Sequence, residues 1–318
     1  MRDLLVTYRP LIEFVLLNAS LALSVYITLA TGLLSLANAG FMAIGAYTAA
    51  LLYVYRHSPA LALYRTAPVL TSVVLAMAIA LVVGFLLGRP ILRLRDVYLA
   101  IATLGFGEIM RILAVNGDAI LGLFLGVPAS DVNVFNGAEG IRVTRLTTTW
   151  QLALYLAVLV YLFVMLRRSR FGRVLEAIRT DEAAAATMGI DVVRYKTFAF
   201  TLSAMIAAGG GALNVLLIRL AAPGDYDFGR AVELLTYVVL GGAAHWSGAL
   251  VGAAVLTILP EALRGLKEQR EIVNGIILML AIIYLPRGLA DPRAWRALLR
   301  RFGGRRPGPL PATSRSEP

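Results

Sequence analysis

RRSRFGRVLEAIRTDEAAAATMGIDVVRYK, residues 167–196, is a long polar segment that separates two strongly apolar ones. It carries seven Arg and Lys side chains against four Asp and Glu. A bilayer does not accommodate such a segment, and arginine-rich loops of membrane proteins lie on the cytoplasmic side. We therefore expect residues 167–196 to form a cytoplasmic loop.

The apolar side chains of this loop recur at helical spacing between charged residues, which predicts a first short helix. A run of four alanines at 183–186, all strong helix formers, predicts a second. Gly189 is expected to end that second helix. Two short helices with charged outer surfaces would form a docking surface for a soluble partner.

The composition of the chain indicates a polytopic membrane protein. Of its 318 residues 59% are hydrophobic and 15% are charged, whereas soluble domains are about a quarter charged. The net charge of +11 comes from arginines that flank apolar segments, so membrane topology explains it better than a nucleic-acid partner does. We expect a helical bundle of about eight to ten spans, because each span takes about 20 residues.

The sequence excludes several kinds of chemistry. It has no cysteine and only two histidines, His57 and His245, neither near a second metal ligand. It has no phosphate-binding G-x-x-x-x-G-K-[ST] motif and no recurring Ser/His/Asp or carboxylate cluster. We therefore expect no enzymatic site, no metal and no cofactor in this chain, and we expect no cleavable signal peptide.

Apolar segments follow one another along the whole chain, at residues 11–36, 41–55, 68–87, 97–115, 150–166, 197–218, 231–240, 248–259 and 272–285. The pair 231–240 and 248–259 is interrupted by GGAAHWSG, which begins at Gly241 and Gly242. Segments this short with glycines between them are typical of a broken or re-entrant helix. Residues 116–149 are polar and are expected to be a periplasmic loop.

Two further groups of residues are candidates for helix packing or for the translocation path. Asn38 and Gly45 belong to a segment dense in small residues, which favours close helix packing. Glu108 and Arg111 lie three apart on one helix face and can pair. The pair either holds helices together, the interpretation we favour, or lines a path with Thr103.

Residues 169–204, SRFGRVLEAIRTDEAAAATMGIDVVRYKTFAFTLSA, resemble the cytoplasmic coupling loop of ABC importer permeases of the branched-chain amino acid type. Residues 32–52, 98–111 and 238–264 resemble other signatures of the same family. The resemblance implies that the ATPase is contacted by Arg170, Phe171, Gly172, Arg173, Ala184, Ala185 and Gly189, with Phe171 inserted into a groove of the ATPase. Ala183 stands where the wider superfamily has Glu.

The resemblance also implies an architecture and a set of partners. The fold would be the large-permease, cobalamin-importer-like ABC importer fold, with the permease over residues 1–289 and a basic cytoplasmic tail over 290–318. The partners would be a second permease subunit in a heterodimer, cytoplasmic subunits that bind and use ATP, and a periplasmic or lipid-anchored solute-binding protein. The location would be the plasma membrane of a bacterium or archaeon.

Three alternatives remain open at the level of sequence. Close relatives of such permeases take urea or short amides instead of branched-chain amino acids. A secondary transporter or channel that works alone would need ionisable residues along several spans, and only Glu13, Glu108 and Glu233 lie near apolar segments. A membrane-embedded enzyme would need a catalytic constellation that the sequence lacks.

Overall fold

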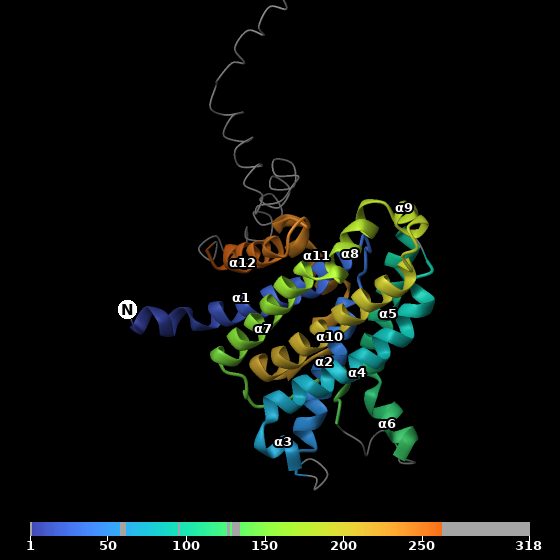
Figure 1. Cartoon of the computed structure of the whole chain (residues 1–318). Coiled ribbons are helices and arrows are strands. Elements are labelled where there is room, and N and C mark those ends of the chain that lie inside the picture. Colours follow the sequence, from blue (N-terminus) through green and yellow to red (C-terminus); the bar gives the residue numbers. More distant parts are fainter. Residues whose placement is uncertain (1, 58–61, 95, 126–127, 129–133, 263–318) are drawn as a thin grey trace, which may run out of the picture.

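The computed structural model describes residues 2–57, 62–94, 96–125, 128 and 134–262, and this part of the chain is almost entirely helical (Figure 1). The helices are α1 Arg2–Leu29, α2 Asn38–Val54, α3 Ala62–Thr66, α4 Pro68–Ile91, α5 Asp96–Val115, α6 Gly117–Leu125, α7 Thr149–Arg168, α8 Arg170–Thr180, α9 Glu182–Thr187, α10 Val192–Ile218, α11 Phe228–Gly241 and α12 Trp246–Ala262. Two 3-10 turns, η3 Gly137–Glu139 and η4 Pro223–Tyr226, and two short strands, β1 Ile141–Arg142 and β2 Leu220–Ala221, complete the described elements.

The described residues contain five helices that are long and apolar enough to cross a membrane, or six if the bent pair α11 and α12 counts as one span. α2 is apolar but shorter. The chain is thus a multi-pass membrane protein. This number is below the expected eight to ten, and the last expected span, 272–285, lies outside the described residues.

The structure moves several boundaries that the sequence predicted. α1 begins at Arg2, with Pro10 inside the helix, where we expected the first segment to begin at residue 11. α4 begins as expected at Pro68, which suits the first helical turn because its missing N–H would have no partner there. The polar 116–149 region contains the helix α6 and the strand β1, neither of which the sequence analysis expected.

α10 and α2 form the centre of the bundle. In the most apolar 18-residue window of α10, 78% of the window is made of buried residues. In the corresponding window of α7, which lies at the periphery, the share is 17%. A Cβ at Gly45 would overlap the backbone of Ala208, and one at Gly211 would overlap the backbone of Met42. Only glycine allows the two helices to approach this closely, which is the packing that small residues permit in lipid.

A buried polar group ties α2 to α1 and α10. The Asn38 side-chain amide donates to the Ser24 hydroxyl at 2.8 Å and to the Ser203 hydroxyl at 2.9 Å. Ser203 in turn donates to the Ser24 carbonyl at 2.7 Å. Buried polar groups with satisfied hydrogen bonds fix one arrangement of the helices around them.

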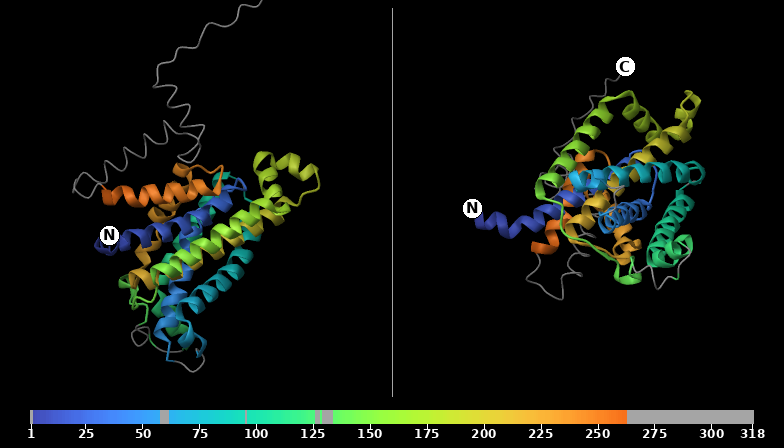
Figure 2. Two further views of the ribbon diagram at one scale, coloured as in Figure 1. Left: turned by 60° about the vertical axis from the view of Figure 1, so that its left-hand side comes forward. Right: turned by 90° about the horizontal axis from the view of Figure 1, so that it is seen from below.

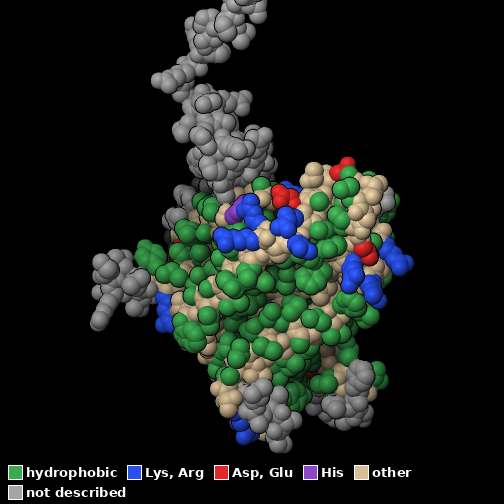
Figure 3. All heavy atoms as spheres, in the orientation of Figure 1, with side chains coloured by type: hydrophobic (Ala, Val, Ile, Leu, Met, Phe, Trp, Pro, Cys, Tyr) green, Lys and Arg blue, Asp and Glu red, His purple; other side chains and the backbone are tan. Residues whose placement is uncertain are grey.

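The two ends of the bundle differ in charge. Side chains of Lys and Arg gather at the end of the molecule where α8 and α9 lie, above a broad apolar belt (Figure 3). At the opposite end β1 pairs antiparallel with β2, Ile141 opposite Ala221, so the loop before α7 is fastened to the turn after α10. Figure 2 shows α12 lying along α1.

We predict that Gly45→Ala destabilises the folded chain, because the added methyl would meet the Ala208 backbone, which cannot turn aside as a side chain can. Overpacking of this kind costs about 1–3 kcal/mol, occasionally more. The melting temperature in detergent, followed by size-exclusion chromatography of the heated protein, measures the effect. Gly105→Ala is the matched control, since nothing lies within 4 Å of a Cβ there. Equal melting temperatures for the two variants would contradict this packing.

Candidate coupling site

The connection between α7 and α10 folds into two short helices because each helix start carries its own cap. The Ser169 hydroxyl accepts a hydrogen bond from the Gly172 N–H at 3.2 Å and starts α8. The Asp181 carboxylate accepts from the Ala184 N–H at 2.9 Å and starts α9, and Asp191 starts α10 in the same way. Capping residues satisfy N–H groups that a helix start leaves without partners.

Two glycines set the corners of this connection. A Cβ at Gly172 would overlap the carbonyl of Leu166, so only glycine fits where α8 leaves α7. Gly189 has φ +81°, and the Ile190 N–H donates to the Ala185 carbonyl at 3.2 Å, which closes α9 with a Schellman motif. The structure thus confirms that Gly189 ends the second helix.

The 167–196 loop has a small core of its own, formed by Ile178 of α8, Ala185 of α9 and Val192 of α10. An ion pair between Lys196 and Glu182, 2.5 Å from nitrogen to oxygen, ties α9 to the first turns of α10. A shared core and an ion pair thus join α8 and α9 to the first turns of α10.

The Phe171 ring packs partly against α10. Its ring lies 4.6 Å from the ring of Phe198 and 5.2 Å from that of Tyr195, measured between centroids. We expected this ring to insert into a groove of a partner, and that insertion stays a prediction, since the ring is only partly buried by its contacts with α10. Arg170 and Arg173 beside it are exposed.

The most exposed large apolar side chain of the loop is that of Met188, at 83%. Met188 directly follows α9. Ala184 and Gly189 close to it are also exposed, whereas Ala185 faces the small core. An unbranched apolar side chain held out from a well-ordered corner suits contact with another protein.

α8 is hydrogen-bonded to the break between α11 and α12. The Arg179 guanidinium donates to the Ala243 carbonyl at 3.0 Å. There the chain bends by 117°, and Gly242 has φ +102°. His245 Nδ1 accepts the Ser247 N–H at 3.1 Å, so His245 caps the start of α12. This break is the broken helix that the sequence predicted.

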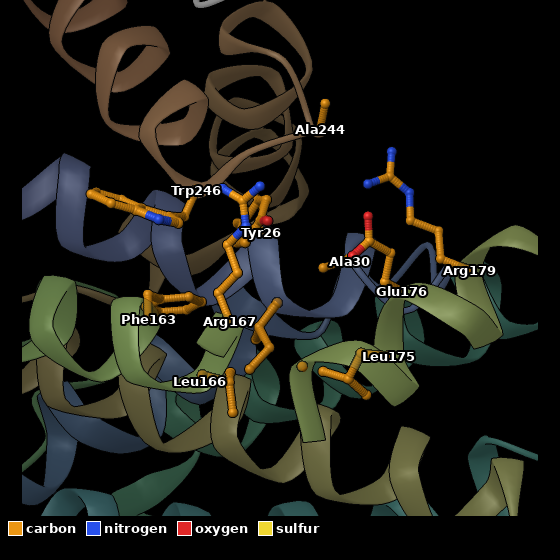
Figure 4. A pocket seen from close by; sticks show the side chains of 12 residues that line it. Tyr26, Ala30, Phe163, Leu166, Arg167, Leu175, Glu176, Arg179, Ala244 and Trp246 are labelled. Atoms are coloured by element: carbon orange, nitrogen blue, oxygen red, sulfur yellow. The ribbon is translucent and has the colours of Figure 1, made fainter. Parts of the chain in front are cut away.

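A cleft of ≈ 70 Å³ lies at this junction, between the ends of α1 and α7, the helix α8 and the break. Figure 4 shows the side chains of Arg167, Glu176 and Arg179 extending toward the segment that carries Ala244 and Trp246. A displacement of α8 would therefore act on the α11–α12 break through direct contacts.

The remaining candidate residues lie away from this junction. Arg111 Nη2 is 2.6 Å from Glu108 Oε1, so the expected ion pair forms. Both residues belong to α5, and among the described residues neither side chain forms a hydrogen bond or ion pair with a second helix, so this contact by itself supports neither helix packing nor a path. Glu108 is 43% exposed and Arg111 33%, and Glu108 borders a small cleft beside η4.

Thr103, which we grouped with this pair, is fully buried, and its hydroxyl accepts the Leu36 N–H at 3.0 Å. It therefore fastens the α1–α2 connection to α5 instead of facing a cavity. Gly241 and Gly242 sit where α11 and α12 touch: a Cβ at Gly241 would overlap the backbone of Gly248.

Arg179 and Asp181 are functional candidates that the sequence analysis did not single out. Asp181 was detectable, because Asp followed by a run of alanines is a helix-start signal. The Arg179 contact was not, since Ala243 lies 64 residues further along the chain. Among the described residues no three His, Cys, Asp or Glu side chains are grouped as a metal site would need.

Comparison with known proteins gives a family match over most of the chain. The model of the family described as branched-chain amino acid transport system / permease component matches residues 12–285. The high-affinity branched-chain amino acid transport system permease protein LivM of Salmonella typhimurium and that of Escherichia coli K12 are each 36% identical over 281 residues. The match covers 81% of this chain but only 64% of those proteins.

A second kind of permease matches more weakly. The permease protein LivH of Escherichia coli K12, from a high-affinity branched-chain amino acid transport system, is 29% identical over 150 residues, or 46% of this chain and 48% of that protein. No solved structure matches. The likeness to the cobalamin-importer fold therefore stays a prediction.

We predict that Gly189→Ala loosens α9, because a residue with a Cβ pays about 1–2 kcal/mol in the left-handed region. Amide exchange across residues 184–190 should become roughly 5–30-fold faster in hydrogen-exchange mass spectrometry. Gly189→Asn is the control, since Asn tolerates this conformation at helix ends. Exchange in Gly189→Ala as slow as in the unchanged protein would be incompatible with the Schellman motif.

Proposed function

The chain belongs to the family of permease components of branched-chain amino acid transport systems, and from this membership we propose that it is the membrane-spanning subunit of an ATP-driven importer. A separate subunit hydrolyses the ATP, and the 167–196 loop receives the resulting motion. The observation that carries this proposal is the contact of Arg179 with Ala243, which connects a capped, rigid pair of surface helices to the break in a membrane helix.

We infer that the end of the bundle with α8 and α9 faces the cytoplasm. The exposed arginines at this end include Arg89, Arg93, Arg168, Arg170 and Arg194. The positive-inside rule places such residues on the cytoplasmic side of the plasma membrane. Residues 116–149 and the turn around η4 then face the periplasm, where a solute-binding protein delivers its ligand.

In the proposed mechanism the ATPase subunits grip α8 and α9 from the cytoplasm. Met188, Arg170 and Arg173 are the exposed side chains that contact them, while Phe171 transmits force to α10 from inside the chain. When the ATPase dimer closes, α8 moves as a rigid body and shifts the α11–α12 break. A rigid-body shift of this kind changes the side of the membrane to which the path is open.

The proposals for the substrate and for a second permease subunit are based on the similar proteins. The similar proteins are permeases of branched-chain amino acid transport systems, so leucine, isoleucine and valine are the proposed cargo. Similarity to both LivM and LivH supports a pair of related permease chains around one path. No feature of the described residues favours urea or an amide.

The alternative of a secondary transporter finds no support in the acids of the membrane segments. Glu13 is bound by Arg145 at 2.5 Å and by Arg9 at 3.1 Å. Glu108 is paired with Arg111, and Glu233 with Arg230 at 2.6 Å. These carboxylates are engaged in ion pairs with arginines, whereas a relay would need acids placed so that protons pass from one to the next.

Affinity purification of the tagged chain from its native membrane in mild detergent tests the assembly. We expect an ATPase with phosphate-loop motifs and a second permease chain to co-purify, identified by mass spectrometry. Recovery of the chain alone or as a homodimer, without an ATPase, would contradict the proposal. It would favour the alternative that the chain is a secondary transporter.

We predict that Arg179→Ala lowers ATP-driven leucine uptake roughly tenfold in proteoliposomes, because hydrogen bonds to charged groups contribute about 1.5–3 kcal/mol. Co-purification with the ATPase should persist, since the lost contact lies inside this chain. Arg194→Ala, an exposed arginine of the same loop, should transport normally. Normal uptake by Arg179→Ala would remove the proposed route from α8 to the break.

A further inference from the structure

A second cavity, of ≈ 370 Å³, opens at the end of α10 opposite the 167–196 loop. Its walls come from α1, α2, α10, η4 and α11. Its volume falls within the range of small-molecule sites, which run from about 300 to 1,000 Å³. In the proposed orientation this cavity lies on the periplasmic side.

The cavity presents one cation and three acids, Arg230 with Asp225, Asp227 and Glu233. Two of the acids have structural partners: Glu233 pairs with Arg230, and Asp227 accepts the Arg230 backbone N–H at 3.0 Å as the cap of α11. Among the described residues Asp225 has no ion-pair partner within 4 Å. A carboxylate without an ion-pair partner attracts an ammonium group.

Protein atoms around Asp225 favour the neutral form of its carboxyl in the absence of a ligand. The residue is exposed at the mouth of the cavity, yet burial of its carboxyl raises the pKa of Asp225, and nearby Arg230 only partly offsets that rise. A ligand ammonium beside the carboxyl would favour its charged form, because an opposite charge at close range does so.

The Arg230 guanidinium is fixed in place and keeps donors for a ligand. Nη1 donates to Glu233 at 2.6 Å, and Nη2 donates to the Asn18 side chain at 2.9 Å. Asn18 also donates to the Thr257 hydroxyl at 3.0 Å, so α1 and α12 both hold this arrangement. A guanidinium has five N–H donors in a fixed plane that matches a carboxylate.

A buried amide faces the same cavity. Asn214 lies on α10, is 4% exposed, and lines the cavity wall. The Tyr226 hydroxyl, which the Asn214 amide approaches, is buried and has no partner of good hydrogen-bond geometry among the described residues, but Tyr226 lines the cleft beside Glu108 and not this cavity. The Asn214 amide in the cavity wall can both donate to and accept from a ligand.

Apolar side chains complete the wall: Phe14 of α1, Met42 of α2 and Ile218 of α10. A cavity with a guanidinium, a free carboxylate, an amide and an apolar wall matches the parts of an aliphatic α-amino acid. We propose that this cavity binds the zwitterion, with Arg230 on the α-carboxylate, Asp225 on the α-ammonium and the apolar wall against the side chain. The inference rests on the proposed function and locates its substrate.

Equilibrium binding of radiolabelled leucine to the purified complex in nanodiscs, without solute-binding protein, tests this site. We expect Asp225→Asn to weaken leucine binding roughly tenfold or more, since the neutral amide loses the charged hydrogen bond to the ammonium group. Arg230→Lys, which keeps the charge but loses the planar fork, should also weaken it. Glu139→Gln, the loss of an exposed carboxylate near η4, is the matched control and should bind normally.

Two competitors separate the roles of the residues. 4-Methylpentanoate lacks the ammonium, so Asp225→Asn should leave its competition unchanged while Arg230→Lys weakens it. 3-Methylbutylamine lacks the carboxylate and should show the reverse. ATP hydrolysis by each variant complex, at the level of the unchanged complex, establishes that the subunits are folded and assembled.

The possible results separate a failure of the proposed site from a failure of the proposed function. Leucine binding by Asp225→Asn equal to that of the unchanged complex, or competitors that do not discriminate between the variants, would overturn the site. ATP-driven leucine uptake without leucine binding to the complex would also overturn the site and leave the proposed function standing. A complex that hydrolyses ATP but neither binds nor transports leucine would overturn both.

Discussion

The fold depends on how closely the backbones of α2 and α10 approach. Lipid offers little hydrophobic gain for helix association, so a bundle must be held by close packing and by polar contacts. Gly45 and Gly211 remove the side chains that would separate the two helices, and the hydrogen bonds from Asn38 to Ser24 and Ser203 fix their register. α1, α4 and α11 are then arranged around this pair.

The two sites described above lie at opposite ends of the same helices. α10 begins in the core of the 167–196 loop and ends at the polar cavity with Asn214, and α11 begins at that cavity with Arg230 and ends at the break that Arg179 contacts. The loop and the cavity need not share a residue for a change at one of them to affect the other. A helix that is rigid over its length carries a change from the loop to the cavity.

The sequence predicted what depends on local pattern. The membrane class, the two short helices of the loop, the stop at Gly189 and the break after Gly241 all follow from composition, spacing or special residues. Contacts between distant parts could not be predicted in this way: Arg179 with Ala243, Asn18 with Arg230, and β1 with β2 each join segments far apart in the chain. The insertion of Phe171 into a groove of an ATPase stays a prediction, because its spacing indicates a partly buried face but not which surface covers it.

The β1–β2 pairing gives α7 and α10 a mechanical property. At one end the Val143 N–H bonds to the Arg219 carbonyl at 2.9 Å, and the Leu146 N–H to the Leu216 carbonyl at 3.0 Å. At the other end α8 and α9 bridge the same two helices, and the Tyr155 hydroxyl bonds across the middle to Ile206 at 2.9 Å. The two helices thus form a closed frame. A frame joined at both ends holds the two helices at a fixed spacing, so we expect them to move together instead of separating as the arms of a hinge would.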